Sequence, residues 1–194
     1  MQPLYLFVGK SASGKTTIAN LLEENYNYKP VESYTTRPPR YVGERGHTFV
    51  SENEFDNLED LAAYTEYNGH KYGTTNEQLD SCDLYVIDVP GVETLLERYT
   101  TDREIYIIYF DSNVHTRILR MIDRHDSDMA IINRLLQDEQ YNWYSRLRAL
   151  VRYHTCFEHQ NIALHKIDAN KNIENVLQQI LCYINDLKKE DDER

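Results

Sequence analysis

The sequence of 194 residues lacks a long hydrophobic run, a basic N-terminal segment and a set of paired cysteines. No apolar stretch approaches the roughly 18 residues that cross a bilayer, so a membrane-spanning protein is not expected. The short apolar run near the N-terminus follows no basic residues, which argues against a secretory signal peptide. The three cysteines of the chain, Cys82, Cys156 and Cys182, lie far apart, so a disulfide framework is not expected either. These absences predict a cytoplasmic protein without a membrane partner.

Positive charge is also scarce. The chain has 21 Lys and Arg against 32 Asp and Glu, a formal net charge of −11. Because nucleic acids attract basic surfaces, such an acidic chain is not expected to bind nucleic acid. Hydrophobic residues make up 41% of the chain, enough for a single domain with a buried core. The sequence contains no internal repeat and is compatible with either a monomer or a homodimer.

Strand-like and helix-like segments alternate along most of the chain. Short apolar runs predict buried strands over residues 4–8, 84–89, 105–110 and 162–167. Apolar residues at helical spacing predict helices over residues 16–25, 92–99, 114–125, 131–157 and 173–187. This alternation is typical of the α/β class, with a parallel sheet covered by helices on both faces.

Residues 32–80 depart from that alternation. They contain Thr-, Tyr- and Gly-rich pieces with little helical period. The pattern predicts short strands or turns over residues 48–51, 63–67 and 71–75, and a helix only over residues 52–61. We therefore expect a small mixed α+β insertion, residues 32–80, between core segments 1–31 and 81–194.

The clearest motif is a phosphate-binding loop after the first predicted strand. Residues 9–16, G-K-S-A-S-G-K-T, match the pattern G-x-x-x-x-G-K-[ST] in full. The glycines let successive backbone N–H groups turn toward phosphate oxygens, Lys15 brings a positive charge to the terminal phosphates, and the Thr16 hydroxyl can bind Mg²⁺. The motif predicts an ATP site, and its expected contacts are Gly9, Lys10, Ser11, Ala12, Ser13, Gly14, Lys15, Thr16 and Thr17.

Further motifs follow in a fixed order. They are S-Y-T-T-R-P-P-R at residues 33–40, G-E-R-G at 43–46, F-V-S at 49–51, G-H-K-Y-G-T at 69–74 and I-D-V-P-G at 87–91. In this order they resemble the guanylate kinase family, from the phosphate loop to about residue 134 and more loosely beyond it. The resemblance implies a three-layer P-loop NTPase core, an insertion that binds the nucleoside monophosphate, and a short lid over residues 125–133.

Two arginines in the insertion fit the same interpretation. Arg37 and Arg40 flank prolines that stiffen the backbone, and guanidinium groups held in this way suit a phosphate monoester. A solvated surface pair is the alternative. The resemblance implies that Ser33, Arg37, Arg40 and Tyr72 bind the phosphate of the acceptor nucleotide.

Two further residues, Thr74 and Asp88, are candidates for contacts with the base and with Mg²⁺. The resemblance implies that Thr74 and Asp88 help to read the base or to order water and Mg²⁺. Asp88 also stands out by itself, because it follows a predicted strand at the edge where α/β sheets bind ligands. We therefore expect Thr16 and Asp88 as candidate Mg²⁺ contacts.

The insertion also departs from the family pattern. His47 replaces a tyrosine of the family; it can still donate a hydrogen bond to a phosphate, and adds charge below about pH 6.5. Ala63 stands where the family has a glutamate that reads guanine, and the nearest carboxylate is Glu66. Because an odd shift along a strand reverses the face, either the strand is bulged so that Glu66 reads the base, or the base is read differently.

Arginines are concentrated after the third predicted core strand. Arg117, Arg120 and Arg124 recur at the spacing of one helix face. A salt-bridged helix surface is one interpretation. The resemblance favours a lid instead, in which Arg120, Arg124 and Arg134 close over the triphosphate and act in catalysis together with Lys15.

The sequence therefore predicts phosphoryl transfer from Mg·ATP to GMP or dGMP, with ADP and GDP or dGDP as products. A kinase of the same fold with another acceptor, such as a different nucleotide or a sugar phosphate, is an alternative. A binding module without turnover is a second alternative. Such modules usually carry a degraded phosphate loop, whereas Lys15 and Thr16 are present here.

Overall fold

The core of the molecule is a parallel sheet of four strands in the order β6-β1-β7-β8. The computed structural model describes residues 2–139, 142–158 and 161–192. The strands are β1 (Leu4–Val8), β6 (Leu84–Val86), β7 (Ile105–Asp111) and β8 (Ile162–Asp168). All four were predicted. Strand β6 is shorter than expected because Asp88 caps helix α4, which begins at Val89.

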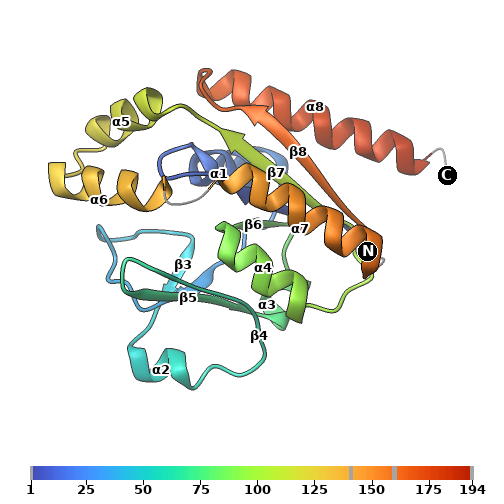
Figure 1. Ribbon diagram of the computed structural model, residues 1–194, viewed down its shortest axis with the longest axis horizontal. Helices are drawn as coiled ribbons and strands as arrows, with labels where there is room; N and C mark the ends of the chain where they lie inside the picture. The colour runs from blue at the N-terminus through green and yellow to red at the C-terminus, as the bar shows by residue number, and fades with distance from the viewer. Residues whose placement is uncertain (1, 140–141, 159–160, 193–194) are drawn as a thin grey trace.

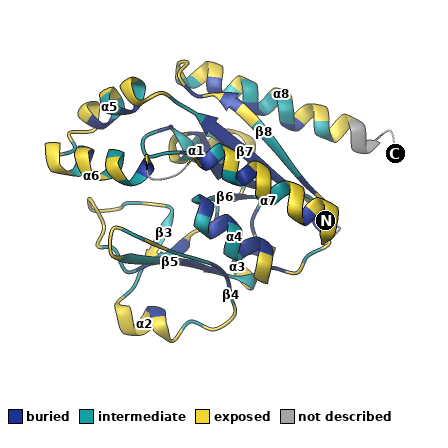
Figure 2. Ribbon diagram, in the orientation of Figure 1, coloured by how far each residue is buried: buried dark blue, intermediate teal, exposed yellow. Residues whose placement is uncertain are grey.

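Helices cover both faces of this sheet (Figure 1). They include α1 (Lys15–Tyr26) and α8 (Ile173–Asp192) on one face, and α4 (Val89–Arg98) and α7 (Trp143–Phe157) on the other. Successive side chains of β1 alternate between the two layers: Leu4, Leu6 and Val8 pack with α4 and α7, whereas Tyr5 and Phe7 pack with α1 and α8. The buried strands and exposed outer helix faces of Figure 2 follow from this arrangement. The predicted three-layer α/β fold is confirmed.

A second, mixed sheet of order β3-β2-β5-β4 lies within residues 33–75. Its strands are β2 (Ser33–Thr35), β3 (His47–Phe49), β4 (Leu61–Tyr67) and β5 (His70–Thr75). The predicted helix over residues 52–61 is wrong in length, because α2 (Glu52–Asp56) ends before a turn at Asp60, whose φ is 54°. A short helix, α3 (Asn76–Asp80), was not predicted; Thr75 and Gln78 cap its start reciprocally.

The long helix predicted over residues 131–157 is wrong. The chain instead forms two helices there, α6 (Asp128–Asp138) and α7, whereas α5 (Val114–Asp123) matches the separate helix predicted over residues 114–125. Asp138 turns inward at the end of α6, and the Asn142 side chain accepts a hydrogen bond from Ser145 N to begin α7. Residues 140 and 141 of the predicted helix lie outside the described residues. Within the described part of the chain, no helix is long and apolar enough to cross a membrane.

Candidate functional site

The phosphate loop joins β1 to α1 at the edge where the parallel strands end. Gly14 has a φ of 100°, in the left-handed region that favours glycine. Gly9 packs so closely on β7 that an added Cβ would lie 2.9 Å from the Phe110 carbonyl oxygen. The first glycine therefore allows close packing against the sheet, and the second allows the turn into α1.

Lys15 reaches back across its own loop. Its Nζ donates hydrogen bonds to the carbonyl oxygens of Gly9 at 2.6 Å and Lys10 at 3.0 Å, and to Ser13 Oγ at 3.3 Å. Burial lowers the pKa of Lys15 to about 8, while Asp138 and Asp88 act in the opposite direction. The ammonium is thus held inside the loop by neutral oxygens, with two carboxylates near it.

The structure places the predicted ATP contacts in three different locations. Ala12, Ser13, Gly14, Lys15, Thr16 and Thr17 line a cavity of about 600 Å³, which we call the loop cavity. Arg120, Arg124 and residues 171–173 form its other side. Gly9 and Ser11 line a second space instead, and Lys10 lies apart beside Glu139.

Arg120 connects the two sides of the loop cavity. Its Nη1 donates to Ser13 O at 3.0 Å, and its Nη2 donates to Ala169 O at 2.8 Å. The guanidinium therefore connects the phosphate loop to the segment between β8 and α8. Since its donors already meet backbone oxygens, Arg120 shapes the cavity wall.

The second space, the insertion cleft, has a volume of about 180 Å³ and opens between the phosphate loop, the mixed sheet and the end of β6. Of the residues predicted to bind the acceptor, Ser33, Arg40, His47, Tyr72 and Asp88 line it. Lys15 lines both the insertion cleft and the loop cavity, so the two spaces meet at its side chain.

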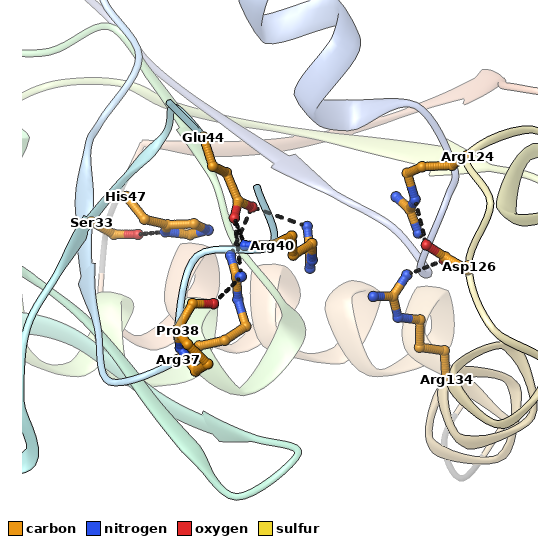
Figure 3. A network of polar contacts seen from close by, with 9 residues as sticks. All are labelled: Ser33, Arg37, Pro38, Arg40, Glu44, His47, Arg124, Asp126 and Arg134. Atoms are coloured by element: carbon orange, nitrogen blue, oxygen red, sulfur yellow. Dashed lines mark hydrogen bonds and ion pairs between the residues drawn. The ribbon is translucent and has the colours of Figure 1, made fainter. Parts of the chain in front are cut away.

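Arg37 does not line the insertion cleft. Figure 3 shows its guanidinium against Glu44, with Nη2 donating to Oε1 at 2.8 Å and Nη1 donating to Oε2 at 3.1 Å. The same carboxylate accepts from Arg40 N at 2.6 Å and Arg40 Nη1 at 3.3 Å. Although burial opposes the shift, these bonds lower the pKa of Glu44. Arg37 thus holds the loop that presents Arg40, which differs from its expected direct place in the cleft.

His47 lies beside this cluster and shares a hydrogen bond of 2.9 Å with the Ser33 hydroxyl through Nδ1 (Figure 3). Burial, followed by the nearby Arg37 guanidinium, lowers the pKa of His47 to about 4. The expectation that His47 adds charge below about pH 6.5 is therefore wrong for the free protein, because the imidazole stays neutral down to about pH 4.

Strand β4 does not bring Glu66 to the cleft. A register shift between Leu61 and Ala63 is present, but Thr65 and Tyr67 are the side chains that line the cleft. Glu66 lies between them on the opposite face, exposed, and accepts a hydrogen bond from the Tyr64 hydroxyl. The prediction that Glu66 lies in the base pocket is therefore wrong, because alternate residues of a strand point to opposite faces.

Thr74 is also absent from the cleft lining, because it is fully buried and its hydroxyl donates to Gln78 Oε1 at 2.9 Å. Thr65, which the sequence analysis missed, donates instead to Asp88 Oδ2 at 3.0 Å, while Asp88 Oδ1 accepts from Gly91 N at 2.8 Å. Burial raises the pKa of Asp88. Because residues two apart on a strand share a face, the position of Thr65 two residues after Ala63 could have predicted its place in the cleft.

The lid arginines meet a carboxylate of their own. Arg124 and Arg134 both contact Asp126, with Arg124 Nε at 3.0 Å from Oδ1 and Arg134 Nη1 at 2.6 Å from Oδ2. Figure 3 shows this group opposite the Arg37–Glu44–Arg40 cluster. The charges of Arg124 and Arg134 help to lower the pKa of Arg40, after burial. Positive charge from the lid and from the insertion therefore converges on the space between them.

Arg117 does not belong to this group of lid arginines. It is buried within the interior and donates to Asp138 Oδ2 at 2.7 Å and to Glu139 Oε1 at 2.8 Å. Asp138 in turn accepts a hydrogen bond from Ser11 N at 2.8 Å. No motif predicted Asp138, which is buried beside the insertion cleft.

Of the two predicted Mg²⁺ contacts, Thr16 and Asp88, one suits the ion better than the other. In the described residues, no cluster of three or more His, Cys, Asp or Glu side chains is arranged to hold a metal ion. The exposed Thr16 hydroxyl lines the loop cavity, which suits Mg²⁺ that takes most of its ligands from nucleotide phosphates and water. Both Asp88 oxygens already accept hydrogen bonds, so Thr16 is the better candidate contact.

Comparisons with known proteins agree with this arrangement, although no family model matches the chain. The chain is 32% identical to the guanylate kinase of Geobacter metallireducens over 146 residues, covering 68% of this chain and 70% of that protein. It is 30% identical to the guanylate kinase of Lactobacillus acidophilus over 161 residues, covering 72% and 78%.

Solved structures show the same fold. The guanylate kinase from Anaplasma phagocytophilum matches with a TM-score of 0.52 and 17% identity, covering 95% of this chain and 85% of that one. A sugar kinase from Janibacter sp. matches with a TM-score of 0.52 and 15% identity, covering 95% of each. Fold and site together define a P-loop phosphotransferase. Its sequence relatives narrow the class further: the chain belongs to the guanylate kinase family.

Proposed function

We propose that this protein transfers the terminal phosphoryl group of Mg·ATP to the phosphate of GMP or dGMP, giving ADP and GDP or dGDP. The observation that carries the proposal is the position of Lys15, which lines both the loop cavity and the insertion cleft. A donor triphosphate in the loop cavity and an acceptor phosphate in the cleft would meet at one ammonium group. Direct transfer requires this arrangement, with the two substrates in line on either side.

Charge neutralisation and positioning supply the chemistry. The acceptor phosphate is already an anion, so no side chain has to remove a proton from it. Lys15, Arg124 and Arg134 would stabilise the charge that spreads over the transferring group. The Thr16 hydroxyl, together with the nucleotide, would hold Mg²⁺, whose charge would neutralise part of the phosphate charge. Closure of the lid would keep water from the reacting group.

The acceptor would be held by the insertion. Arg40, the Ser33 and Tyr72 hydroxyls and the neutral His47 line the cleft and suit the phosphate end of a nucleotide. The paired Thr65 and Asp88 also line the cleft and offer a hydroxyl and a carboxylate. Each Asp88 oxygen accepts one hydrogen bond and keeps a second lone pair, which could accept from the ring N–H or amino group of guanine, and this supports guanine as the base.

A specific observation favours a second candidate. Ala63 replaces the carboxylate of the family pattern, and Glu66 faces solvent. A kinase of the same fold with another nucleotide or a sugar phosphate as acceptor is therefore the alternative.

A panel of acceptors separates the two candidates. ADP release would be measured with Mg·ATP and each of GMP, dGMP, AMP, CMP, UMP, TMP and ribose 5-phosphate, with Lys15→Ala as the blank for contaminating kinases. Turnover confined to GMP and dGMP is the expected result. Turnover confined to another acceptor would establish the second candidate. Binding of GMP without turnover of any acceptor would instead indicate a binding module.

A further inference from the structure

Asp138 is a buried carboxylate that none of the sequence motifs explains. It lies at the C-terminal end of α6 with no exposed surface. Its Oδ2 accepts from Ser11 N at 2.8 Å and from Arg117 Nη1 at 2.7 Å, and its Oδ1 accepts from Ser11 Oγ at 3.3 Å. A carboxylate in such a place is stable only because these donors replace the water it has lost.

The neighbouring Glu139 provides a contrast. Its side chain is 56% exposed and binds Arg117 Nη2 at 2.8 Å and Lys10 Nζ at 2.7 Å. It contacts no backbone group of the phosphate loop, since its partners are side chains. Two adjacent acids thus share Arg117, but only Asp138 holds the backbone of the loop.

Asp138 also connects the loop to the lid. Arg134 lies four residues earlier in α6, on the same helix face as Asp138. Fixing Asp138 on the loop therefore fixes how far Arg134 reaches over the site. On the other side, Ser11 Oγ and the Tyr67 hydroxyl share a hydrogen bond of 3.1 Å, which links the loop to strand β4 of the insertion.

We propose that Asp138 is a positioning residue for phosphoryl transfer, which through Ser11 ties the phosphate loop to lid helix α6 on one side and to insertion strand β4 on the other. The inference rests on the proposed kinase function. Asp138 is not a catalytic residue, because its oxygens are occupied by donors and its negative charge would repel a phosphate. It acts by setting where Lys15, Arg134 and the acceptor module lie relative to one another, and small displacements of such groups lower rates strongly.

The test compares Asp138→Asn with the matched control Glu139→Gln. Asparagine removes the negative charge that faces Arg117, and its amide nitrogen, in place of Oδ1, donates to Ser11 Oγ instead of accepting from it, so that this hydroxyl has to turn away from its present bond. We expect Asp138→Asn to lower kcat by about 30-fold, with the KM values of ATP and acceptor changed by less than about threefold. Glu139→Gln is expected to stay within about twofold of the parent. Equal kcat in the parent and Asp138→Asn, or a loss in Asp138→Asn confined to KM, would overturn the proposal.

A second variant guards against a loss of folding. Tyr67→Phe removes only the hydroxyl that meets Ser11 and keeps the ring. We expect its kcat to fall about threefold or more at unchanged KM for ATP; a parental kcat would overturn the link to β4.

Hydrogen exchange separates this inference from the proposed function, because it needs no turnover. Peptides covering residues 9–15 and 128–138 are expected to exchange faster in Asp138→Asn than in Glu139→Gln. Parental protection of both peptides in Asp138→Asn would overturn the proposal. An inactive parent protein with the expected exchange difference would instead contradict the kinase function alone.

Discussion

At the scale of single residues, the arginines of the site form ion pairs with carboxylates of the protein. Glu44 holds Arg37 and Arg40, and Asp126 holds Arg124 and Arg134. A guanidinium group bound in this way has a partner already, and an arriving phosphate has to replace that carboxylate. Lys15 differs, since its partners are oxygens of its own loop.

Replacing Lys15 tests whether its ammonium meets the transferring group. We expect Lys15→Ala to lower kcat by about 100-fold or more, because no other described residue lines both the loop cavity and the insertion cleft. The measurement is steady-state ADP release, with circular dichroism to verify the fold. Lys166→Ala, an exposed lysine on β8, is the control and should keep the parental rate. Near-parental turnover in Lys15→Ala would refute the mechanism.

His47 makes stability depend on pH. Its pKa of about 4 in the folded protein lies below the ordinary value of 6.5. Between these pH values the unfolded chain binds a proton and the folded chain does not, so the free energy of unfolding falls as pH drops from 6.5 toward 4. We expect the parent to lose about 1–2 kcal/mol more than His47→Gln between pH 7 and pH 5.

Urea unfolding at the two pH values provides this measurement. His115→Gln removes an exposed histidine and serves as the control, which should keep the parental pH dependence. If His47→Gln lost as much stability as the parent over this range, the depressed pKa would not be the source of the effect.

At the scale of secondary structure, the lid is a short connection between α5 and α6. His125, with a φ of 59°, turns the chain after α5, and Asp126 follows it directly. Asp126 binds an arginine on each side of this turn. The lid arginines are therefore held by a residue of the lid itself, and an incoming phosphate has to compete with that carboxylate.

Removing this competition has a measurable consequence. We expect Asp126→Asn to bind ADP about threefold to tenfold more tightly, because Arg124 and Arg134 no longer pair with a carboxylate. Titration calorimetry at low salt would measure the change. Asp128→Asn, in the exposed first turn of α6, is the matched control. Weaker binding in Asp126→Asn would mean that Asp126 positions the arginines rather than competing for them.

At the scale of the whole molecule, a buried arginine joins segments distant in the sequence. Arg103 donates from Nε to Gln2 O at 2.7 Å, from Nη1 to Leu79 O at 2.7 Å, and from Nη2 to Pro3 O at 3.0 Å and Cys82 O at 2.8 Å. It thereby fixes the start of β1 and the return of the chain from the insertion to the core. These contacts lie at the edge of the sheet away from the phosphate loop.

Lysine cannot replace this planar arrangement of donors. We expect Arg103→Lys to lower the free energy of unfolding by about 3 kcal/mol, because several buried carbonyl oxygens lose their partners. Chemical denaturation measures the loss, and KM for both substrates should stay parental. Arg98→Lys, an exposed arginine at the end of α4, should change stability by less than about 0.5 kcal/mol. A stable Arg103→Lys would show that solvent or neighbouring groups satisfy those oxygens.

Local pattern was enough for the core strands, most helices and the phosphate loop. Buried strands read as continuous apolar runs, and a loop with its own glycines and lysine needs no distant partner to be recognised. The helix over residues 131–157 was mispredicted because its apolar pattern continues across the break, where α6 ends at Asp138 and the Asn142 side chain caps the start of α7.

The sequence by itself determined the fold class, the family and the residue types that gather at the site. Only the tertiary structure decided which of them face the cleft. Glu66 lies on the outer face of β4, Thr74 is buried against Gln78, and Arg37 is bound by Glu44. The physical reason is that strand register, burial and ion pairing are set by contacts between segments far apart in the chain, and one residue of register reverses the face on which a side chain lies.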